Sequence, residues 1–197
     1  MANTTLLPEP DKFYHIFNRG IDGCDLFREK DNYAHFLRLY EKHIYPVAET
    51  YSWCLMPNHF HLLIQVRSLR ELHGAENQGR NPVSQAFSNL FNAYTKAVNK
   101  RYGRTGSLFE KNFHRIAVSS ESYLRHLVVY IHNNPVHHGF CDNLWDYPWS
   151  SYGTIISANP TKLKRSQVIG WFDDKGNFMA VHQQNMPSKL IEQFILE

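Results

Sequence analysis

The segment of residues 50–66 most restricts what this chain can fold into. Residues 50–55 and residues 59–66 (HFHLLIQV) are both rich in β-prone side chains. Met56, Pro57 and Asn58 lie between them and form a tight connection, since proline and asparagine favour turns. The two runs therefore predict a β-hairpin, and every other element has to be arranged around it.

Apolar spacing predicts further strands and helices on both sides of this hairpin. Strands are expected where aromatic and β-branched residues are enriched, and helices where apolar residues recur every three or four positions. Pro135 is expected to end the third helix near Asn134. The predicted strands are 13–19, 50–55, 59–66 and 108–118, and the predicted helices are 31–44, 83–101 and 119–134, with a short further helix near 187–196. This order predicts an α+β fold in which helices cover one face of a single sheet.

Composition narrows the classes of protein. With 197 residues, 43% of them apolar, the chain can build the core of one domain. Its net charge of +3 is small, so contacts with nucleic acid have to come from local clusters of basic residues. The sequence has no run of about 18 apolar residues, no pattern typical of a secretory signal, and three isolated cysteines. We therefore expect a cytoplasmic protein with no membrane contact and no disulfide framework.

Two histidines stand two residues apart at the start of the second hairpin strand. In a strand, His59 and His61 point to the same face, while Phe60 points with the apolar residues to the other face. Two neighbouring imidazoles can hold one metal ion. The alternative is two histidines on a solvated sheet face, and the short H-x-H pattern does not decide between the two. In either case the pair is expected near the surface.

A second pair of chemically useful side chains lies on the third predicted helix. Tyr130 and Asn134 are four residues apart and therefore share one helix face. The amide oxygen of Asn134 is a ligand type that hard divalent cations accept. The Tyr130 phenol is a nucleophile once it is deprotonated. On periodicity alone, a place in the core is the simpler interpretation of Tyr130.

Four segments, taken together in their order, give these pairs a context. PNHFHLLIQV (57–66), RTGSLFEKNF (104–113), YIHNNPVHHGF (130–140) and YPWSSY (147–152) resemble segments of the single-tyrosine HUH transposases, and most closely those of the REP-associated tyrosine transposases. The resemblance covers residues 12–152. We therefore expect a transposase-like domain over residues 1–152, and a C-terminal extension over residues 153–197.

The resemblance implies a ferredoxin-like fold and cleavage of single-stranded DNA, often at a hairpin. In this family the histidine pair, here His59 and His61, holds a divalent ion, Mg²⁺ or Mn²⁺. The polar residue four positions after the tyrosine, here Asn134, completes the metal site. The tyrosine, here Tyr130, attacks a DNA phosphodiester and leaves a 5′-phosphotyrosine link and a free 3′-OH. This link conserves the phosphodiester energy, so the strand can be rejoined without ATP.

Three positions depart from the pattern of the family. Lys111 and Asn112 stand where many relatives have glycine and arginine, which is expected to alter the DNA contacts. His132 replaces a common acidic residue and is expected to add a titratable group beside the site.

Relatives include dimers as well as monomers, so the chain is expected to be a monomer or a homodimer.

Basic residues gather in the stretch 96–115, which holds six lysines and arginines and a single acidic residue. Such clusters commonly contact phosphates. Tyr102, Phe109 and Phe113 in the same stretch are candidates for stacking on unpaired bases. The alternative is a solvated helix end followed by a strand whose aromatic residues belong to the core. Given the resemblance, contacts with single-stranded or hairpin DNA are expected from Arg19, Arg101, Arg104, Lys111 and Arg115.

These observations leave three functions to compare. The leading one is a divalent-metal-dependent enzyme that cleaves and rejoins single-stranded DNA. The second is a related protein that binds hairpin DNA or RNA without cutting it. The third is a metal-dependent hydrolase of small phosphoesters in which Tyr130 is structural. The enzyme acting on DNA is favoured because all four positions of the family's site are present, namely His59, His61, Tyr130 and Asn134.

Overall fold

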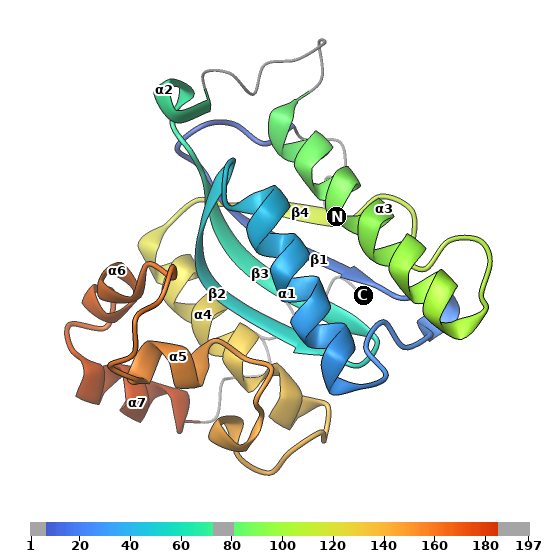
Figure 1. Ribbon diagram of the computed structural model, residues 1–197. Helices are drawn as coiled ribbons and strands as arrows, with labels where there is room; N and C mark the ends of the chain where they lie inside the picture. Colours follow the sequence, from blue (N-terminus) through green and yellow to red (C-terminus); the bar gives the residue numbers. More distant parts are fainter. Residues whose placement is uncertain (1–6, 73–80, 185–197) are drawn as a thin grey trace.

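The computed structural model describes residues 7–72 and 81–184 of the chain (Figure 1). Its elements are β1 (Phe13–Arg19), η1 (Ile21–Gly23), α1 (Lys30–Ile44), β2 (Ala48–Met56), β3 (His59–Val66), α2 (Leu69–Leu72), α3 (Pro82–Tyr102), β4 (His114–Val118), α4 (Glu121–His137), η2 (Leu144–Asp146), α5 (Tyr152–Ile156), α6 (Arg165–Gly170) and α7 (Lys175–His182), where η marks a short 3-10 helix. The predicted bounds of β1 and β3 are confirmed to the residue. The helix predicted near 187–196 lies outside the described residues. Within the described ranges, no helix is both long enough and apolar enough to cross a membrane.

The four strands form one antiparallel sheet in the order β2-β3-β1-β4. Strand β1 pairs with both β3 and β4, and β2 pairs with β3. Because β3 lies between β1 and β2, the connection through α1 skips one strand position, and the connection from β3 to β4 through α3 skips β1. This is the split β-α-β arrangement of ferredoxin-like folds. The predicted α+β fold class is therefore confirmed, with a ferredoxin-like sheet.

Strand β3 shows how the sheet divides the molecule into two apolar layers. Alternate residues of a strand point to opposite faces. Phe60 and Ile64 join the core formed with α1 and α3, as the sequence predicted. Leu63 joins a second core formed with α4, and His61 faces this helix as well. Almost every residue of β3 is buried, because both faces of the sheet are covered.

The prediction that helices cover one face therefore needs a correction. Helices α1 and α3 pack on one face, and α4 packs on the other face against β2 and β3 (Figure 1). The physical reason lies in the strands themselves. Tyr51, Cys54 and Leu63 belong to the second face and would be exposed to water without a covering layer.

Helix α4 runs past the proline that was expected to end it. The Ser120 hydroxyl caps its N-terminus by accepting a hydrogen bond from the Tyr123 amide at 3.2 Å. Pro135 lies inside the last turn, and the helix continues to His137. Proline removes one backbone donor. However, Asn134 is fully buried and Val136 packs against the second core, so tertiary contacts hold the last turn.

The last strand is shorter than predicted, since β4 begins at His114 and the prediction placed its start at residue 108. Leu108, Phe109 and Phe113 are buried in the core beneath α3. Of these, Phe109 forms an isolated bridge with Gly20, at the end of β1. A short apolar run does not by itself distinguish a paired strand from an irregular buried segment.

The described part of the C-terminal extension packs against α4. Ile155, Val168, Phe172 and Phe178 share one apolar cluster with residues of α4 such as Leu127. The helix that carries Tyr130 and Asn134 is consequently held between the sheet on one side and helices α5 to α7 on the other (Figure 1).

Candidate active site

His59 and His61 lie side by side at the start of β3, on the face covered by α4. Their ring centroids are 5.3 Å apart, and the two ring planes are nearly perpendicular. His59 is 4% exposed and His61 is fully buried. The expectation that the pair lies near the surface is therefore wrong, because α4 packs over this part of the sheet.

Helix α4 brings Tyr130 and Asn134 to the same place. The Tyr130 ring stands edge-on to the His61 ring, with centroids 5.4 Å apart. The Asn134 Oδ1 atom lies 3.4 Å from His59 Nε2. The structure thus brings together all four residues that the sequence singled out for chemistry. Tyr130 is 3% exposed, because most of its side chain belongs to the second apolar core.

Both histidines are held through their Nδ1 atoms. His59 Nδ1 lies 2.7 Å from Asn58 Oδ1, and His61 Nδ1 lies 2.9 Å from Nε2 of His15. Because a carbonyl oxygen such as Asn58 Oδ1 only accepts, His59 Nδ1 donates and its Nε2 keeps the lone pair. A hydrogen bond at one ring nitrogen fixes the tautomer and the ring orientation, as it does for histidines that bind metal ions.

His59 Nε2 and Asn134 Oδ1 lie at a separation that suits two ligands of one divalent cation. His59 Nε2 and Asn134 Oδ1 both carry lone pairs, yet they face each other at 3.4 Å. Two neighbouring ligands of one ion lie about 3 Å apart when each bond is about 2.1 Å long. The Nδ2 atom of Asn134 is buried without a hydrogen-bond partner among the described residues. Within the same residues no three His, Cys, Asp or Glu side chains cluster as metal ligands, so a site here depends on the Asn134 amide.

Burial keeps His15 and His61 neutral. Burial lowers the pKa of His61 well below its ordinary value, and the neighbouring His15 and His59 add to the effect. Burial, together with nearby His114, lowers the pKa of His15 to about 3. A neutral imidazole is the form that binds a metal ion. His61 is therefore in the protonation state that ligation requires at neutral pH.

Sequence reasoning missed three neighbours of the site. His15 and Asn58 hold the two histidines, as described above, and the ring of His138 lies 4.9 Å from that of His59. His15 belongs to β1, whose residue Phe17 lies opposite His61. The sequence signal for His15 was its place in an alternating strand. Its contact depends on the register between β1 and β3, which the sequence does not display.

The expectation that His132 lies beside the site is wrong. His132 follows Tyr130 by two residues, and two residues turn a helix by about 200°, so the two side chains point in nearly opposite directions. Its Nδ1 is 2.9 Å from His182 Nε2, and its Nε2 is 2.8 Å from Ser151 Oγ. His182 Nδ1 donates to the Phe178 carbonyl at 2.7 Å, so its Nε2 is an acceptor. His132 consequently donates to His182 and accepts from Ser151, and both rings are neutral. This buried chain ties the helix that carries Tyr130 to α7.

Two of the basic residues predicted to contact DNA line one groove. Lys111 and Arg115 belong to a groove of about 680 Å³ between α3 and residues 106–115. Arg19 donates to Glu110 at 2.7 Å, and Glu110 lines the same groove. Arg19 also lies opposite His59 in the β1–β3 ladder. It therefore stands between this groove and the candidate active site.

The other two basic residues lie near the C-terminal end of α3. Arg101 forms ion pairs with Glu29 at 2.7 Å and with Asp31 at 3.4 Å. Arg104 donates to the Asn99 side chain at 3.0 Å. The acidic partners offset the charge of Arg101. The structure therefore does not bring Arg101 together with Lys111 and Arg115 in one groove.

The aromatic residues of the same stretch follow the alternative interpretation. Phe109 and Phe113 are buried in the core formed with α1 and α3. The Tyr102 hydroxyl is hydrogen-bonded to Asn32 at 2.9 Å and to Glu29. Phe109 and Phe113 are thus mostly core residues, and the Arg28 guanidinium lies over the Tyr102 ring at 4.7 Å.

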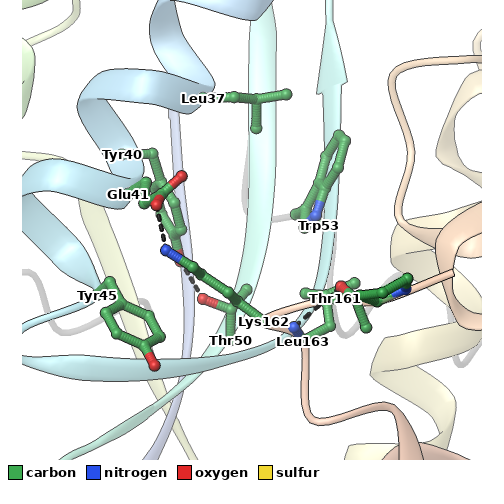
Figure 2. A pocket seen from close by; sticks show the side chains of 10 residues that line it. Leu37, Tyr40, Glu41, Tyr45, Thr50, Trp53, Thr161, Lys162 and Leu163 are labelled. Atoms are coloured by element: carbon green, nitrogen blue, oxygen red, sulfur yellow. Dashed lines mark hydrogen bonds and ion pairs between the residues drawn. The ribbon is translucent and has the colours of Figure 1, made fainter.

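A second pocket, of about 510 Å³, lies between α1, β2 and residues 160–163 (Figure 2). Lys162 reaches Glu41 of α1 across its mouth. The Tyr40 hydroxyl is hydrogen-bonded to Thr50 at 2.8 Å. These polar groups satisfy one another. The pocket lies on the α1 side of β2, and it includes none of the residues of the candidate active site.

The burial of the two histidines determines what their removal is expected to do to stability. Replacing both His59 and His61 by alanine leaves a cavity and takes the hydrogen-bond partner from His15. We expect the free energy of unfolding to fall by about 2–5 kcal/mol, which lowers Tm by about 2–4 °C for each kcal/mol in a chain of this size. The diagnostic measurement is the rise of Tm on adding Mn²⁺, which we expect for the wild type and not for the variant. An equal rise in both proteins would show that Mn²⁺ binds elsewhere.

Comparisons with known proteins point to the same family as the sequence segments did. No family model matches the chain. A curated protein of Haemophilus influenzae, named "Putative REP-associated tyrosine transposase", is 26% identical over 119 residues, which cover 56% of this chain and 62% of that protein. The chain thus spans less than two thirds of the length of this relative. A solved structure of a REP-associated tyrosine transposase bound to a REP hairpin matches with a TM-score of 0.61 and 16% identity, and covers 81% of this chain and 89% of that chain. These findings confirm the resemblance that the sequence segments indicated, and the structural match shows a shared fold.

Proposed function

We propose that this chain is a tyrosine transposase-like enzyme that cleaves and rejoins single-stranded DNA next to hairpins. The observation that carries the proposal is the cluster of Tyr130 and Asn134 against His59 and His61, built from two segments far apart in the sequence. The similarity to REP-associated tyrosine transposases supports this assignment. The solved relative bound to a REP hairpin supports hairpin DNA as the substrate class.

In the proposed reaction Tyr130 is the nucleophile. Its hydroxyl oxygen forms a bond to the phosphorus of a DNA phosphodiester, and the bond from phosphorus to the 3′ oxygen breaks. The phenol proton leaves to solvent, and the departing 3′ oxygen takes up a proton. The product is a 5′-phosphotyrosine and a free 3′-OH. Attack of a 3′-OH on the same phosphorus reverses the step and releases Tyr130, so the strand is rejoined without an added energy source.

His59, His61 and Asn134 are the residues that would hold a divalent ion, Mg²⁺ or Mn²⁺, in this reaction. When bound, such an ion polarises the scissile phosphate and offsets the negative charge that develops on it. His59 and His61 supply neutral ring nitrogens, and Asn134 supplies an amide oxygen. These three ligands carry no charge, so the full charge of the ion is left to act on the phosphate.

DNA contacts are assigned to Arg19, Lys111 and Arg115 around the groove beside α3, with Arg101 and Arg104 at the end of α3. Lys111 is exposed and forms no ion pair with the described residues. Replacing Lys111 by alanine is expected to weaken binding to all single-stranded sequences alike and to reduce the slope of log K against log salt by about 0.7. The measurement is binding to a labelled hairpin oligonucleotide at several salt concentrations.

Lys175 offers a matched control for this prediction. It is an exposed lysine at the start of α7, and it does not line the groove. Replacing Lys175 by alanine makes the same change of net charge and is expected to leave the slope unchanged. Equal slopes for the two variants would remove the groove from the DNA interface.

The test of the proposed function is covalent capture of DNA. Labelled single-stranded hairpin oligonucleotides are incubated with the protein and Mg²⁺ or Mn²⁺, and the products are separated on a denaturing gel. We expect a protein-linked band that EDTA removes. If the protein binds a broad pool of hairpins but forms no such band, the result would support the alternative of a protein that binds hairpin DNA or RNA without cutting it. Absence of both the band and binding would contradict the proposal.

A further inference from the structure

We propose that His15 is a positioning residue that holds His61 in the orientation and tautomer required of a metal ligand. The proposal rests on the proposed function, because it assigns a role to His15 within that metal site. The geometry points to this role through one buried hydrogen bond, which joins His15 Nε2 to His61 Nδ1 over 2.9 Å.

The pair is fixed by its surroundings on both strands. Both rings are fully buried and lie roughly parallel, with centroids 5.1 Å apart and planes at 24°. The His15 ring packs against Phe17 at 4.8 Å and meets the Tyr130 ring edge-on at 6.3 Å. His15 therefore touches both the proposed metal ligand and the proposed nucleophile. A movement of His15 would be passed to both of them.

The hydrogen bond allows a single proton placement when His61 binds a cation. Ligation needs the lone pair on His61 Nε2, so the ring proton has to sit on Nδ1. His61 Nδ1 then donates to His15 Nε2, which has to be bare. The proton of His15 in turn sits on its own Nδ1. If His15 donated instead, His61 would carry its proton on Nε2 and could not bind the ion.

The arrangement has an energetic cost that a purely structural role does not explain. His15 Nδ1 is buried and has no hydrogen-bond partner among the described residues. An unsatisfied buried polar group costs about 1–3 kcal/mol. Phenylalanine or leucine would fill the same place between Phe17 and Tyr130 without this cost. A polar side chain at this position provides an acceptor for His61, which phenylalanine or leucine cannot provide.

The identity of the acceptor also determines the charge of the site. Histidines that bind metal ions commonly donate to a carboxylate, a backbone carbonyl or water. Here the acceptor is the ring nitrogen of His15, which can accept from His61 Nδ1 only while it carries no proton. His61 is thus oriented without adding negative charge beside the position of a DNA phosphate.

His114 provides a matched control on the neighbouring strand. The ring of Phe17 stacks on both His114 and His61, with centroid distances of 4.7 Å and 5.6 Å. His114 forms no hydrogen bond to His59, His61 or Asn134. Replacing His114 by phenylalanine therefore changes the same residue type in the same layer and leaves the bond between His15 and His61 in place.

The experiment measures binding of Mn²⁺ alone to the full-length protein, by the electron paramagnetic resonance signal of free Mn²⁺. We expect His15→Phe to weaken Mn²⁺ binding by about 10–100-fold, the range found for partners of metal ligands. Glutamine can place its amide oxygen near the position of Nε2, so His15→Gln is expected to restore affinity to within about threefold of the wild type. His114→Phe is expected to bind as the wild type does. Circular dichroism and Tm establish that each variant is folded.

Each of the other outcomes contradicts either the role of His15 alone or the proposed metal site as well. Wild-type affinity in folded His15→Phe would contradict the role of His15 and leave the proposed function standing. If His15→Phe does not fold, His15→Asn replaces it, because its shorter amide fits the space but does not reach His61 Nδ1. Wild-type affinity in His15→Asn would then contradict the role equally. A wild-type protein that binds no Mn²⁺, or that binds it unchanged in His59→Ala, would overturn both this role and the proposed metal site.

Discussion

Replacing Tyr130 by phenylalanine is expected to abolish covalent capture of DNA while leaving DNA affinity within about twofold of the wild type. Removing the group that attacks costs at least about a thousandfold in rate when nothing else on the protein can replace it. The substitution deletes a single oxygen and keeps the ring that packs against His61 at 5.4 Å. The fold and the metal site are therefore expected to persist, and the loss should be confined to chemistry.

The measurement is the protein-linked band on a denaturing gel, read beside binding of the same hairpin oligonucleotide. Tyr123→Phe is the matched control, since Tyr123 lies on α4 two turns before Tyr130 and is only partly buried against the second core. We expect this control to keep full activity. Metal-dependent cleavage that survives in Tyr130→Phe would instead support the hydrolase of phosphoesters, in which Tyr130 is structural.

The second large effect is a loss of stability in mild acid. His15, His61, His132 and His182 are all buried and neutral. Burial lowers the pKa of His182 to about 4 and that of His15 to about 3. Burial lowers the pKa values of His61 and His132 well below the ordinary value, and neighbouring histidines add to both shifts. Unfolding returns all four rings to a pKa near 6.5.

The direction of the effect follows from where the protons bind. Above pH 6.5 these histidines are neutral in both states, and the folded state keeps its full stability. Below pH 6.5 the histidines bind protons in the unfolded chain but not in the folded chain. The free energy of unfolding therefore decreases as the pH is lowered, until each folded pKa is reached. Each group contributes up to about 1.4 kcal/mol per pH unit. Between pH 6.5 and 5 the four together remove about 6–7 kcal/mol, comparable to the whole stability of a typical domain.

We therefore expect the protein to unfold near pH 5 in metal-free buffer, as measured by urea titrations at a series of pH values. The matched variant is His182→Gln, which removes one titrating ring and keeps a polar side chain near His132. Its free energy of unfolding should fall less steeply with pH, by up to about 1.4 kcal/mol per pH unit. A wild-type stability that is flat between pH 7 and 5 would contradict the neutral assignment of these rings.

Local sequence patterns predicted the elements whose two faces differ in chemistry. The bounds of β1 and β3 followed from residue classes alone, and so did the segregation of His59 and His61 from Phe60. In these places each local preference agrees with the final packing. The pairing of Tyr130 with Asn134 followed from helical spacing, which is equally local.

The predictions failed where tertiary contacts override a local signal. Pro135 did not end α4, because packing of Asn134 and Val136 holds the last turn. The aromatic run before β4 was assigned to a strand, and its rings instead fill the core under α3. His59 and His61 were expected near the surface, since no local pattern shows that a distant helix covers them.

The sequence by itself determined which residues can do chemistry and which face of its element each one occupies. These are periodic properties, and they depend on neighbours within a few residues along the chain. Only the tertiary structure decided that Tyr130 meets His61, that His15 holds His61, and that His132 faces α7. Those contacts depend on strand register and on the packing of one layer on another. Both are set by the whole core, and no single segment encodes them.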